Sequence, residues 1–307
     1  MSRAATVPRP ARRWVVCADD FALDRGAIEA TLALIKLGRV SATSVLVDSP
    51  NWKAAAPDLK AVSDHADVGL HLNLTEALQD GASTWRARLP SLWIQSMSRL
   101  LPRWRVREGF ERQLDAFTDA FGRLPDFVDG HRHVHQLPVV RDQLIESLLA
   151  REAKIPPWIR IGLPPPGVAD RKARLIGMLG AEALLNNARQ AGFPTNQCLV
   201  GVYGFDLQRD AYLARVRQWF KAGPDGTVFM CHPSARASTK DPIGAARRME
   251  LGVLAGEAYA DTLTRAQITV VRGTALFRAA PSGDPQPAKA VFPASAASSG
   301  TERRTHP

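Results

Sequence analysis

The chain has 307 residues, 45% of them apolar, which is enough to bury one large core or the cores of two ordinary domains. No run of about 18 apolar residues occurs, so we expect no membrane-spanning helix. The net charge of +10 lies largely at the ends, with +4 in residues 1–13 and +2 in residues 277–307, and no nucleic-acid-binding motif accompanies it, so we expect no nucleic-acid partner.

The chain begins with a basic stretch, residues 1–12, which we expect to be disordered. This stretch lacks the apolar segment and the small-residue cleavage site of a signal peptide. The apolar run over 13–19 then predicts a strand that is buried on both faces. Asp24 is placed to cap the following helix, which Gly38 ends.

Strand-like and helix-like runs alternate through the rest of the body. Further strands are expected at 42–48, 67–74, 125–131, 156–162, 197–204, 226–233 and 267–273. Helices are expected between them at 52–63, 107–122, 139–152, 169–192, 209–223 and 243–263. Eight strands alternating with helices predict an α/β fold, a TIM-like (β/α)-barrel with room for distortion, as one domain over residues 13–276. A doubly wound open sheet is the alternative.

The composition of the C-terminal end and the cysteines complete this organisation. Residues 277–307 are rich in Pro, Ser, Ala and Gly, so we expect a second disordered tail. Cys17, Cys198 and Cys231 lie far apart in apolar runs, which predicts buried free thiols. Free thiols fit a reducing compartment, and we expect a cytoplasmic protein.

The unusual polar residues follow the predicted strands where each strand ends. In a barrel these carboxyl ends meet at one mouth, where active sites lie. Each residue alone has a simpler explanation, such as a helix cap or a hydrogen-bonded core histidine. Their joint placement at matching strand ends favours a functional site. The residues are Asp19, Asp20, His71, Asp129, His131 and His232.

The stretch "DFVDGHRHVHQLP" places His131, His133 and His135 at alternate positions. If the strand geometry continues, period two puts all three on one face. We expect His131, nearest the strand end, to bind a metal. His133 and His135 either line a substrate cleft, orient the ligand, or form structural hydrogen bonds, and Asp129 either contacts the substrate or orients a histidine.

These residue types predict a particular chemistry. Two imidazoles and one carboxylate form a facial set for a divalent cation such as zinc or iron. A second carboxylate can take a proton from water, and an imidazole on the far side can protonate a leaving group. The sequence therefore predicts a metal-dependent hydrolase.

Five segments resemble the carbohydrate deacetylase family that includes chitooligosaccharide deacetylases and hopanoid-associated deacetylases, the YdjC-like group. The segments are "ADDFALDRGAIEA", "ATSVLV", "DVGLHLNLTEA", "DFVDGHRHVHQLP" and "VFMCHPS". The resemblance implies a barrel-like fold and removal of an N-acetyl group from an amino sugar in an oligosaccharide or a lipid-linked glycan. It also implies one divalent metal ion, Mg²⁺ or Zn²⁺, bound by Asp20, His71 and His131.

The resemblance also implies two catalytic residues. Asp19 matches the other aspartate of the pair and is expected to act as the base, although sequence alone does not separate its role from that of Asp20. His232 matches the late histidine of related polysaccharide deacetylases and is expected to protonate the amine. Family members usually read "ADDFG", whereas this chain has Ala22, so the turn is expected to differ because glycine admits backbone angles that alanine resists.

The insertion over residues 83–107 carries Trp85, Trp93, Trp104 and six arginines. One interpretation is a barrel helix with its apolar face inward and its arginines in solvent. The other is a lid whose tryptophans stack on sugar rings or rest at a membrane interface, which would suit an anionic or lipid-linked acceptor and a peripheral membrane contact.

Two rival functions remain at this point. Amidohydrolases also use a His-x-His motif, but on the first strand and with an aspartate ending the last, neither of which occurs here. A non-catalytic carbohydrate- or lipid-binding barrel is the second rival, and the substitution at Ala22 leaves room for it. The sequence does not predict an oligomeric state.

Overall fold

The computed structural model describes residues 11–78, 86–167, 170–236, 238 and 240–278. Most of both expected tails lies outside these residues, although Arg12 already belongs to the first strand and Phe277 to the last helix. No described helix is long and apolar enough to cross a membrane. The three cysteines are free and buried, as predicted.

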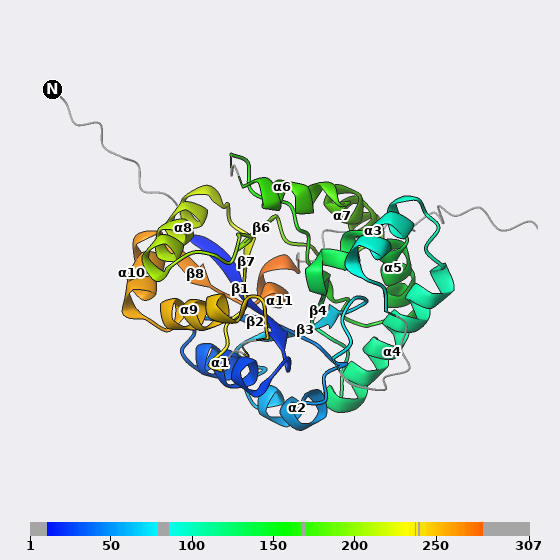
Figure 1. The fold of residues 1–307 in the computed structure, drawn as a ribbon, viewed down its shortest axis with the longest axis horizontal. Helices are drawn as coiled ribbons and strands as arrows, with labels where there is room; N and C mark the ends of the chain where they lie inside the picture. Colours follow the sequence, from blue (N-terminus) through cyan, green and yellow to red (C-terminus); the bar gives the residue numbers. More distant parts are fainter. Residues whose placement is uncertain (1–10, 79–85, 168–169, 237, 239, 279–307) are drawn as a thin grey trace, which may run out of the picture.

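The strands form one parallel sheet that curls into a distorted barrel, with the helices arranged around it (Figure 1). This confirms the predicted fold class. The strands are β1 (Arg12–Phe21), β2 (Ala42–Val45), β3 (Asp67–Leu72), β4 (Phe127–Gly130), β5 (Trp158–Ile159), β6 (Cys198–Val200), β7 (Thr227–Cys231) and β8 (Ile268–Val270). Strands buried on both faces read as continuous apolar runs, which is why β1 is so apolar.

The order of the main path is β5-β4-β3-β2-β1-β7-β6, and β8 pairs with the first residues of β1. Between β5 and β6 the described residues form no ladder, only an isolated bridge from Ile159 to Thr195. The side chain of Asn196 spans this seam. Its Oδ1 accepts from the Ile161 amide at 2.7 Å, and its Nδ2 donates to the carbonyl oxygens of Ile161 and Cys198 at 3.0 and 2.9 Å. Two backbone hydrogen bonds also cross the seam, from the Ile159 amide to the Pro194 carbonyl at 2.9 Å and from the Leu199 amide to the Leu163 carbonyl at 2.7 Å, so the ring is closed here without a regular ladder.

The described helices are α1 (Arg25–Lys36), α2 (Trp52–Lys60), α3 (Leu89–Met97), α4 (Arg103–Phe121), the 3₁₀ helix η1 (His131–Gln136), α5 (Val140–Ala150), α6 (Arg171–Met178), α7 (Ala181–Gln190), α8 (Arg209–Ala222), α9 (Gly244–Leu254), α10 (Glu257–Arg265) and α11 (Gly273–Phe277). The predicted helices are all present among the described residues, two of them each split into two, while η1 and α11 were not predicted and α3 lies within the insertion. As predicted, Asp24 caps α1 by accepting from the Ala27 amide at 2.7 Å.

The predicted helix over 169–192 is interrupted at Gly180. This residue has a φ of +113°, and a Cβ there would lie 2.5 Å from the Gln136 carbonyl oxygen, so only glycine fits. The predicted helix over 243–263 is likewise split, at Gly256, into α9 and α10. The insertion is shorter than the predicted 83–107, because α4 already begins at Arg103. Among the described residues of that range, α3 is the added helix.

Candidate active site

A cavity of about 700 Å³ lies at the carboxyl ends of the strands. Its floor is polar and comes from β1, β3, β4 and β7, while α3 and α6 supply apolar wall residues. Asp19, Asp20, His71, His131 and His232 all line it, so the cavity collects side chains from four strand ends.

The end of β1 is irregular, and this aims both aspartates into the cavity. In a regular strand, neighbouring side chains point to opposite faces. Here the pairing of β1 with β2 shifts register between Ala18 and Phe21, and Asp20 has a φ of +63°. Irregularities of this kind redirect side chains near active sites. Asp19 and Asp20 therefore both reach the same cavity.

Ala22 continues this turn with a φ of +72°, in the left-handed region that favours glycine. Its carbonyl oxygen accepts from Ser49 Oγ at 2.5 Å and from Asn51 Nδ2 at 3.3 Å. These contacts hold the turn in place, so alanine adopts the backbone angles at a steric cost of about 1 kcal/mol.

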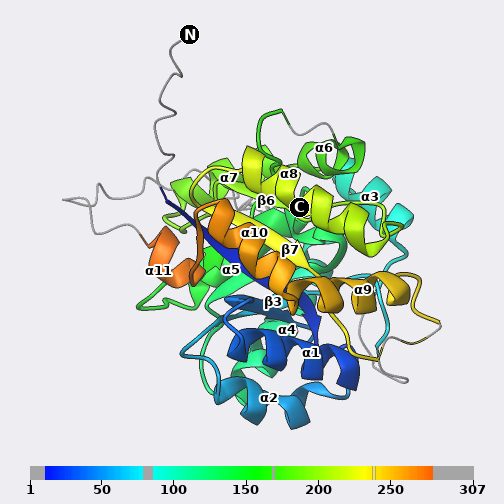
Figure 2. The same ribbon diagram turned by 90° about the vertical axis from the view of Figure 1, so that its left-hand side faces the viewer.

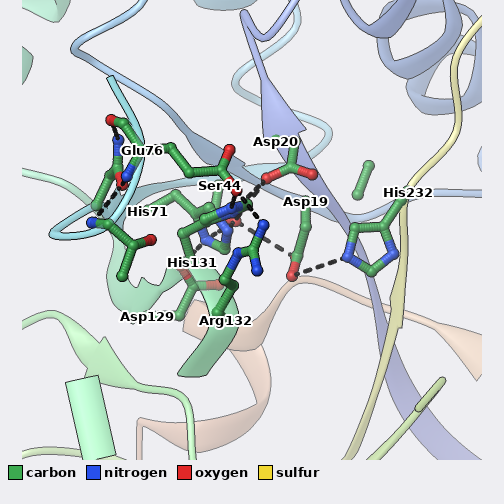
Figure 3. Close-up of polar contacts among 12 residues, drawn as sticks. Asp19, Asp20, Ser44, His71, Glu76, Asp129, His131, Arg132 and His232 are labelled. Atoms are coloured by element: carbon green, nitrogen blue, oxygen red, sulfur yellow. Dashed lines mark hydrogen bonds and ion pairs between the residues drawn. The ribbon is translucent and has the colours of Figure 1, made fainter. Parts of the chain in front are cut away.

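Asp20, His71 and His131 converge on one point of the cavity floor (Figure 3). Asp20 Oδ1 lies 3.4 Å from His71 Nε2 and 3.0 Å from His131 Nδ1. One ligand atom from each residue lies within 4.8 Å of the others, which is close enough to share a single cation. These are the three residues that sequence analysis assigned to a metal.

The atoms of this trio that face away from the common point have partners of their own. His71 pairs in register with Asp129 of β4, and its Nδ1 lies 2.6 Å from Asp129 Oδ1. His131 Nε2 lies 3.3 Å from Glu76 Oε1, and Arg247 donates to Asp20 Oδ2 at 2.7 Å. Metal-binding histidines in proteins are usually held in this way by a second group.

The protonation of the trio is set by this crowding. Burial alone would lower the pKa of His71, but Asp129, Asp20 and Asp19 outweigh it and raise the pKa to about 10. Burial would raise the pKa of Asp20, yet Arg247 and His131 lower it well below its usual range. The carboxylate is thus ionised, and a bound cation would replace the proton on the imidazole.

Asp19 contacts Arg160 rather than His71 or His131. Arg160 donates from Nη1 to Asp19 Oδ1 at 2.6 Å and from Nη2 to Oδ2 at 2.8 Å, while Nη1 also lies 2.8 Å from Asp129 Oδ2. Burial would raise the pKa of Asp19, but Arg160 overrides it and the pKa falls. Cys17, Asp19 and Asp129 also form a cluster of metal-ligand type, but the guanidinium of Arg160 already supplies its cation.

His232 approaches Asp19 from the side opposite His71 and His131 (Figure 3). Its Nε2 lies 4.0 Å from Asp19 Oδ2, and its ring packs edge-on against Phe205. Burial lowers the pKa of His232 to about 4 despite the two aspartates, so its imidazole is neutral at pH 7.

The expectation that His131, His133 and His135 alternate along one strand is wrong. Strand β4 ends at Gly130, and η1 follows with a φ of +59° at His133. A Cβ on Gly130 would lie 2.9 Å from both the amide nitrogen and Nδ1 of His135, so the chain folds back tightly over this glycine. His133 still lines the cavity, whereas His135 does not: it is fully buried and its Nε2 donates to the Arg160 carbonyl at 2.8 Å.

Comparison with known proteins places this architecture in a family. The model described as YdjC-like protein matches residues 13–265, which is most of the chain. The chain belongs to the YdjC-like family. It is 27% identical to a chitooligosaccharide deacetylase of Yersinia pestis (strain Pestoides F) over 72% of this chain and 81% of that protein.

Two further relatives of this YdjC-like chain bear on its fold and extent. It is 35% identical to a human carbohydrate deacetylase, but the match spans 46% of this chain and only 47% of that protein. A crystal structure from Enterococcus faecalis V583, of a protein assigned to cellobiose-phosphate cleavage, superposes with a TM-score of 0.65 at 18% identity, covering 87% of this chain and 99% of that one. The superposition with the Enterococcus protein shows that the two chains share a fold.

Sequence analysis missed four charged residues at the YdjC-like site. Arg160 stands out in hindsight, since "WIRIG" places an arginine inside an apolar run. Glu76 lies within the segment "DVGLHLNLTEA", but nothing in the sequence pattern assigned it a role. His131 and Arg132 lower its pKa to about 2, although burial acts in the opposite direction. Arg247 and Glu250 lie on α9, where helix periodicity alone predicts nothing of their contacts.

Glu250 is a buried acid behind His232 in this YdjC-like barrel. Its Oε2 accepts from the backbone nitrogen of His232 at 2.5 Å, and its Oε1 accepts from the Tyr203 hydroxyl at 2.6 Å. Burial raises the pKa of Glu250 to about 7, above the ordinary value of 4.5. The carboxyl group therefore stabilises the fold in its protonated form.

This pKa predicts a pH-dependent stability. Because the folded-state pKa exceeds the unfolded value, the stabilisation is complete below pH 4.5 and is lost as the pH rises through 7. In the wild type, the unfolding free energy should fall by on the order of 3 kcal/mol as the pH rises through this window. In Glu250→Gln this fall should be absent, because glutamine does not titrate. Urea unfolding across this pH range measures it, with Glu257→Gln on exposed α10 as the control. Parallel pH profiles for wild type and Glu250→Gln would contradict the prediction.

Proposed function

We propose that this YdjC-like protein is a metal-dependent hydrolase that removes an N-acetyl group from an amino sugar. The observation that carries the proposal is the convergence of Asp20, His71 and His131 on one point of the cavity floor, next to Asp19 and His232. The names of the human and Yersinia relatives, which are carbohydrate and chitooligosaccharide deacetylases, support the same substrate class.

The donor set fits a divalent cation. His71 Nε2, His131 Nδ1 and Asp20 Oδ1 face one another, while their outer atoms are held by Asp129, Glu76 and Arg247. Two imidazoles favour Zn²⁺ over Mg²⁺, which prefers oxygen ligands. When bound, such a cation supplies Lewis-acid activation of water and of the acetamide carbonyl.

Asp19 is placed to accept the proton of the attacking water. Its two oxygens are aimed by the two nitrogens of Arg160, so its orientation is fixed before the substrate enters. Asp20 has both histidines as neighbours and Asp19 has none within 3.5 Å, which favours Asp20 as the ligand and Asp19 as the base.

His232 is placed to protonate the departing amine. The imidazole of His232 is neutral at pH 7, so it must first gain the proton that it delivers. That proton comes from the attacking water by way of Asp19, whose Oδ2 lies 4.0 Å from His232 Nε2. An imidazolium with so low a pKa gives up its proton readily. The carbonyl carbon gains a C–O bond, the C–N bond breaks, and acetate and the free amine leave.

The apolar wall of the cavity supports recognition of a sugar ring. Trp93 of α3 and Phe205 line it, and aromatic faces commonly pack on the apolar faces of sugars. The substrate is an oligosaccharide or a lipid-linked glycan. We propose a cytoplasmic location, which the three free thiols support.

Metal removal tests this function directly. Purified protein should release acetate from N-acetylated chitooligosaccharides, and dialysis against a chelator should lower the rate at least roughly 100-fold. Adding back one equivalent of Zn²⁺ should restore it. Acetate release that persists after elemental analysis shows the metal to be gone would contradict the metal assignment. Sugar binding without any acetate would instead indicate a non-catalytic carbohydrate-binding barrel.

A further inference from the structure

Large apolar side chains gather on the surface beside the cavity. Nine such side chains are exposed among the described residues, and six of them fall in two short segments, 94–104 and 175–178. Single exposed apolar residues are ordinary, but a cluster of them marks an interaction site. We call these six the rim patch: Ile94, Met97, Leu100, Trp104, Leu175 and Met178.

The rim patch adjoins the mouth of the cavity. Trp93 and Leu89 of α3 and Leu175 of α6 line the same cavity, so the two helices both stand at its mouth, and Figure 2 draws them near each other. Trp93 of α3 lines the cavity, and Ile94 and Met97 lie on the neighbouring stripe of the same helix, facing outward. Leu175 of α6 belongs to both the cavity wall and the exposed surface. The apolar surface therefore continues from inside the cavity to the outside of the protein.

Positive charge surrounds the rim patch. Residues 86–107 contain six arginines and no aspartate or glutamate. Arg88, Arg99, Arg105 and Arg107 are exposed, and no carboxylate of the described residues pairs with any of them. Arg171 and Arg174 add exposed charge on α6. The surface thus combines apolar side chains with unpaired cations.

We propose that the rim patch binds the surface of an anionic lipid bilayer. Apolar side chains enter the boundary between headgroups and acyl chains, while arginines at the same level contact lipid phosphates. Short helices with exposed apolar stripes and basic flanks are typical of proteins that lie on a membrane without crossing it. Docked in this way, the cavity mouth lies at the lipid surface.

The orientation also narrows the substrate, a step that rests on the proposed function. A glycolipid in the bilayer would present its amino sugar to Asp20, His71 and His131 while its lipid part stays near Leu175. The apolar wall then receives the segment between sugar and lipid. Of the two acceptors considered above, this favours the lipid-linked glycan.

Flotation of the full chain with vesicles tests the docking without requiring activity. The wild type should float with phosphatidylcholine–phosphatidylglycerol vesicles and much less with phosphatidylcholine alone. The variant Ile94→Ser/Met97→Ser/Leu100→Ser should lower the partition coefficient at least about tenfold. Arg99→Gln/Arg105→Gln/Arg107→Gln should abolish the preference for the anionic vesicles.

The matched control is Leu37→Ser/Leu149→Ser/Ile155→Ser. These side chains are also more than half exposed, at 51–57%, but they precede β2 and β5 and so lie at the opposite end of the sheet, and flotation should be unchanged. Equal loss in the control, or no loss in the rim variant, would overturn the proposal. Sedimentation gives a further test. A concentration-dependent dimer that the rim variant abolishes would also overturn the proposal, because a second copy of the chain would then cover this face.

The same variants separate this proposal from the proposed function. The serine variant should release acetate from a water-soluble N-acetylated oligosaccharide at the wild-type rate, because none of its three residues lines the cavity. Flotation that depends on the rim patch in a protein without deacetylase activity would support the docking and reject the enzymatic assignment.

Discussion

Replacing His131 with alanine is expected to eliminate metal binding and to reduce acetate release roughly a thousandfold. His131 supplies Nδ1 to the point shared with Asp20 and His71, and it is the most exposed of the three, so truncation leaves the buried pair in place. Asp20 and His71 would retain only two ligand atoms, too few for a stable site on three protein ligands. Elemental analysis and titration calorimetry with Zn²⁺ measure the loss.

A matched control is His65→Ala, because His65 is an exposed histidine outside the cavity. This variant should bind one equivalent of Zn²⁺ and keep its activity. If His131→Ala also keeps both, the assignment of the metal to Asp20, His71 and His131 fails. Thermal unfolding of each variant with and without chelator distinguishes lost metal binding from lost folding.

Replacing Arg160 with leucine is expected to lower the unfolding free energy by about 3–5 kcal/mol at pH 7. Arg160 is fully buried and bridges Asp19 and Asp129, which are themselves buried, so its removal leaves Asp19 without its guanidinium partner and Asp129 with His71 alone. Burying an unpaired charge is far more costly than losing an exposed pair. Urea unfolding at 25 °C measures the difference.

The pH dependence of this loss has a definite sign. In the wild type the pKa of Asp19 is lowered, so its stabilising contribution is present above the unfolded pKa and is lost as the pH falls through the folded one. Without Arg160, burial raises the pKa of Asp19, and the protonated form becomes the stable one. The difference between wild type and variant should therefore be largest near neutral pH and shrink in acid.

The control for this prediction is Arg123→Leu, which removes an exposed pair with Asp126. Its effect should stay within about 1 kcal/mol. Arg160→Lys should recover part of the stability, because an ammonium keeps the charge but cannot bond Asp19 through two nitrogens. An Arg160→Leu variant as stable as Arg123→Leu at neutral pH would contradict the account.

The strands and the main cluster could be read from the sequence because both depend on local patterns. Continuous apolar runs predict strands buried on both faces, and polar residues at their carboxyl ends must share one mouth in a parallel barrel. That logic brings Asp20, His71 and His131 to one mouth together with Asp19, Asp129 and His232, and the resemblance to the YdjC-like group then implies which three of them bind a metal. The structure adds that an irregular end of β1 turns Asp19 and Asp20 toward the same cavity.

The residues that support the cluster could not be read in this way, because their partners are distant in sequence. Arg160 bonds Asp19 across 141 positions, and Glu250 on α9 holds the backbone of His232. An isolated arginine or glutamate in an apolar stretch does not reveal its partner. The predicted alternation of His131, His133 and His135 is wrong for a local reason: Gly130 ends β4, and the chain folds back tightly over it.

The seam at Asn196 has a consequence for how this barrel can deform. Elsewhere, neighbouring strands are joined by ladders that must break together, but at the seam the described residues show one carboxamide, one bridge and the backbone hydrogen bond from Leu199 to Leu163 holding the two sides. Widening the barrel at the seam would break only these few hydrogen bonds and would leave the ladders between the other strands intact. Because α6 follows β5 and walls the cavity, a deformation at the seam would change the shape of the entrance first, while Asp20 of β1, His71 of β3 and His131 of η1 would keep their spacing.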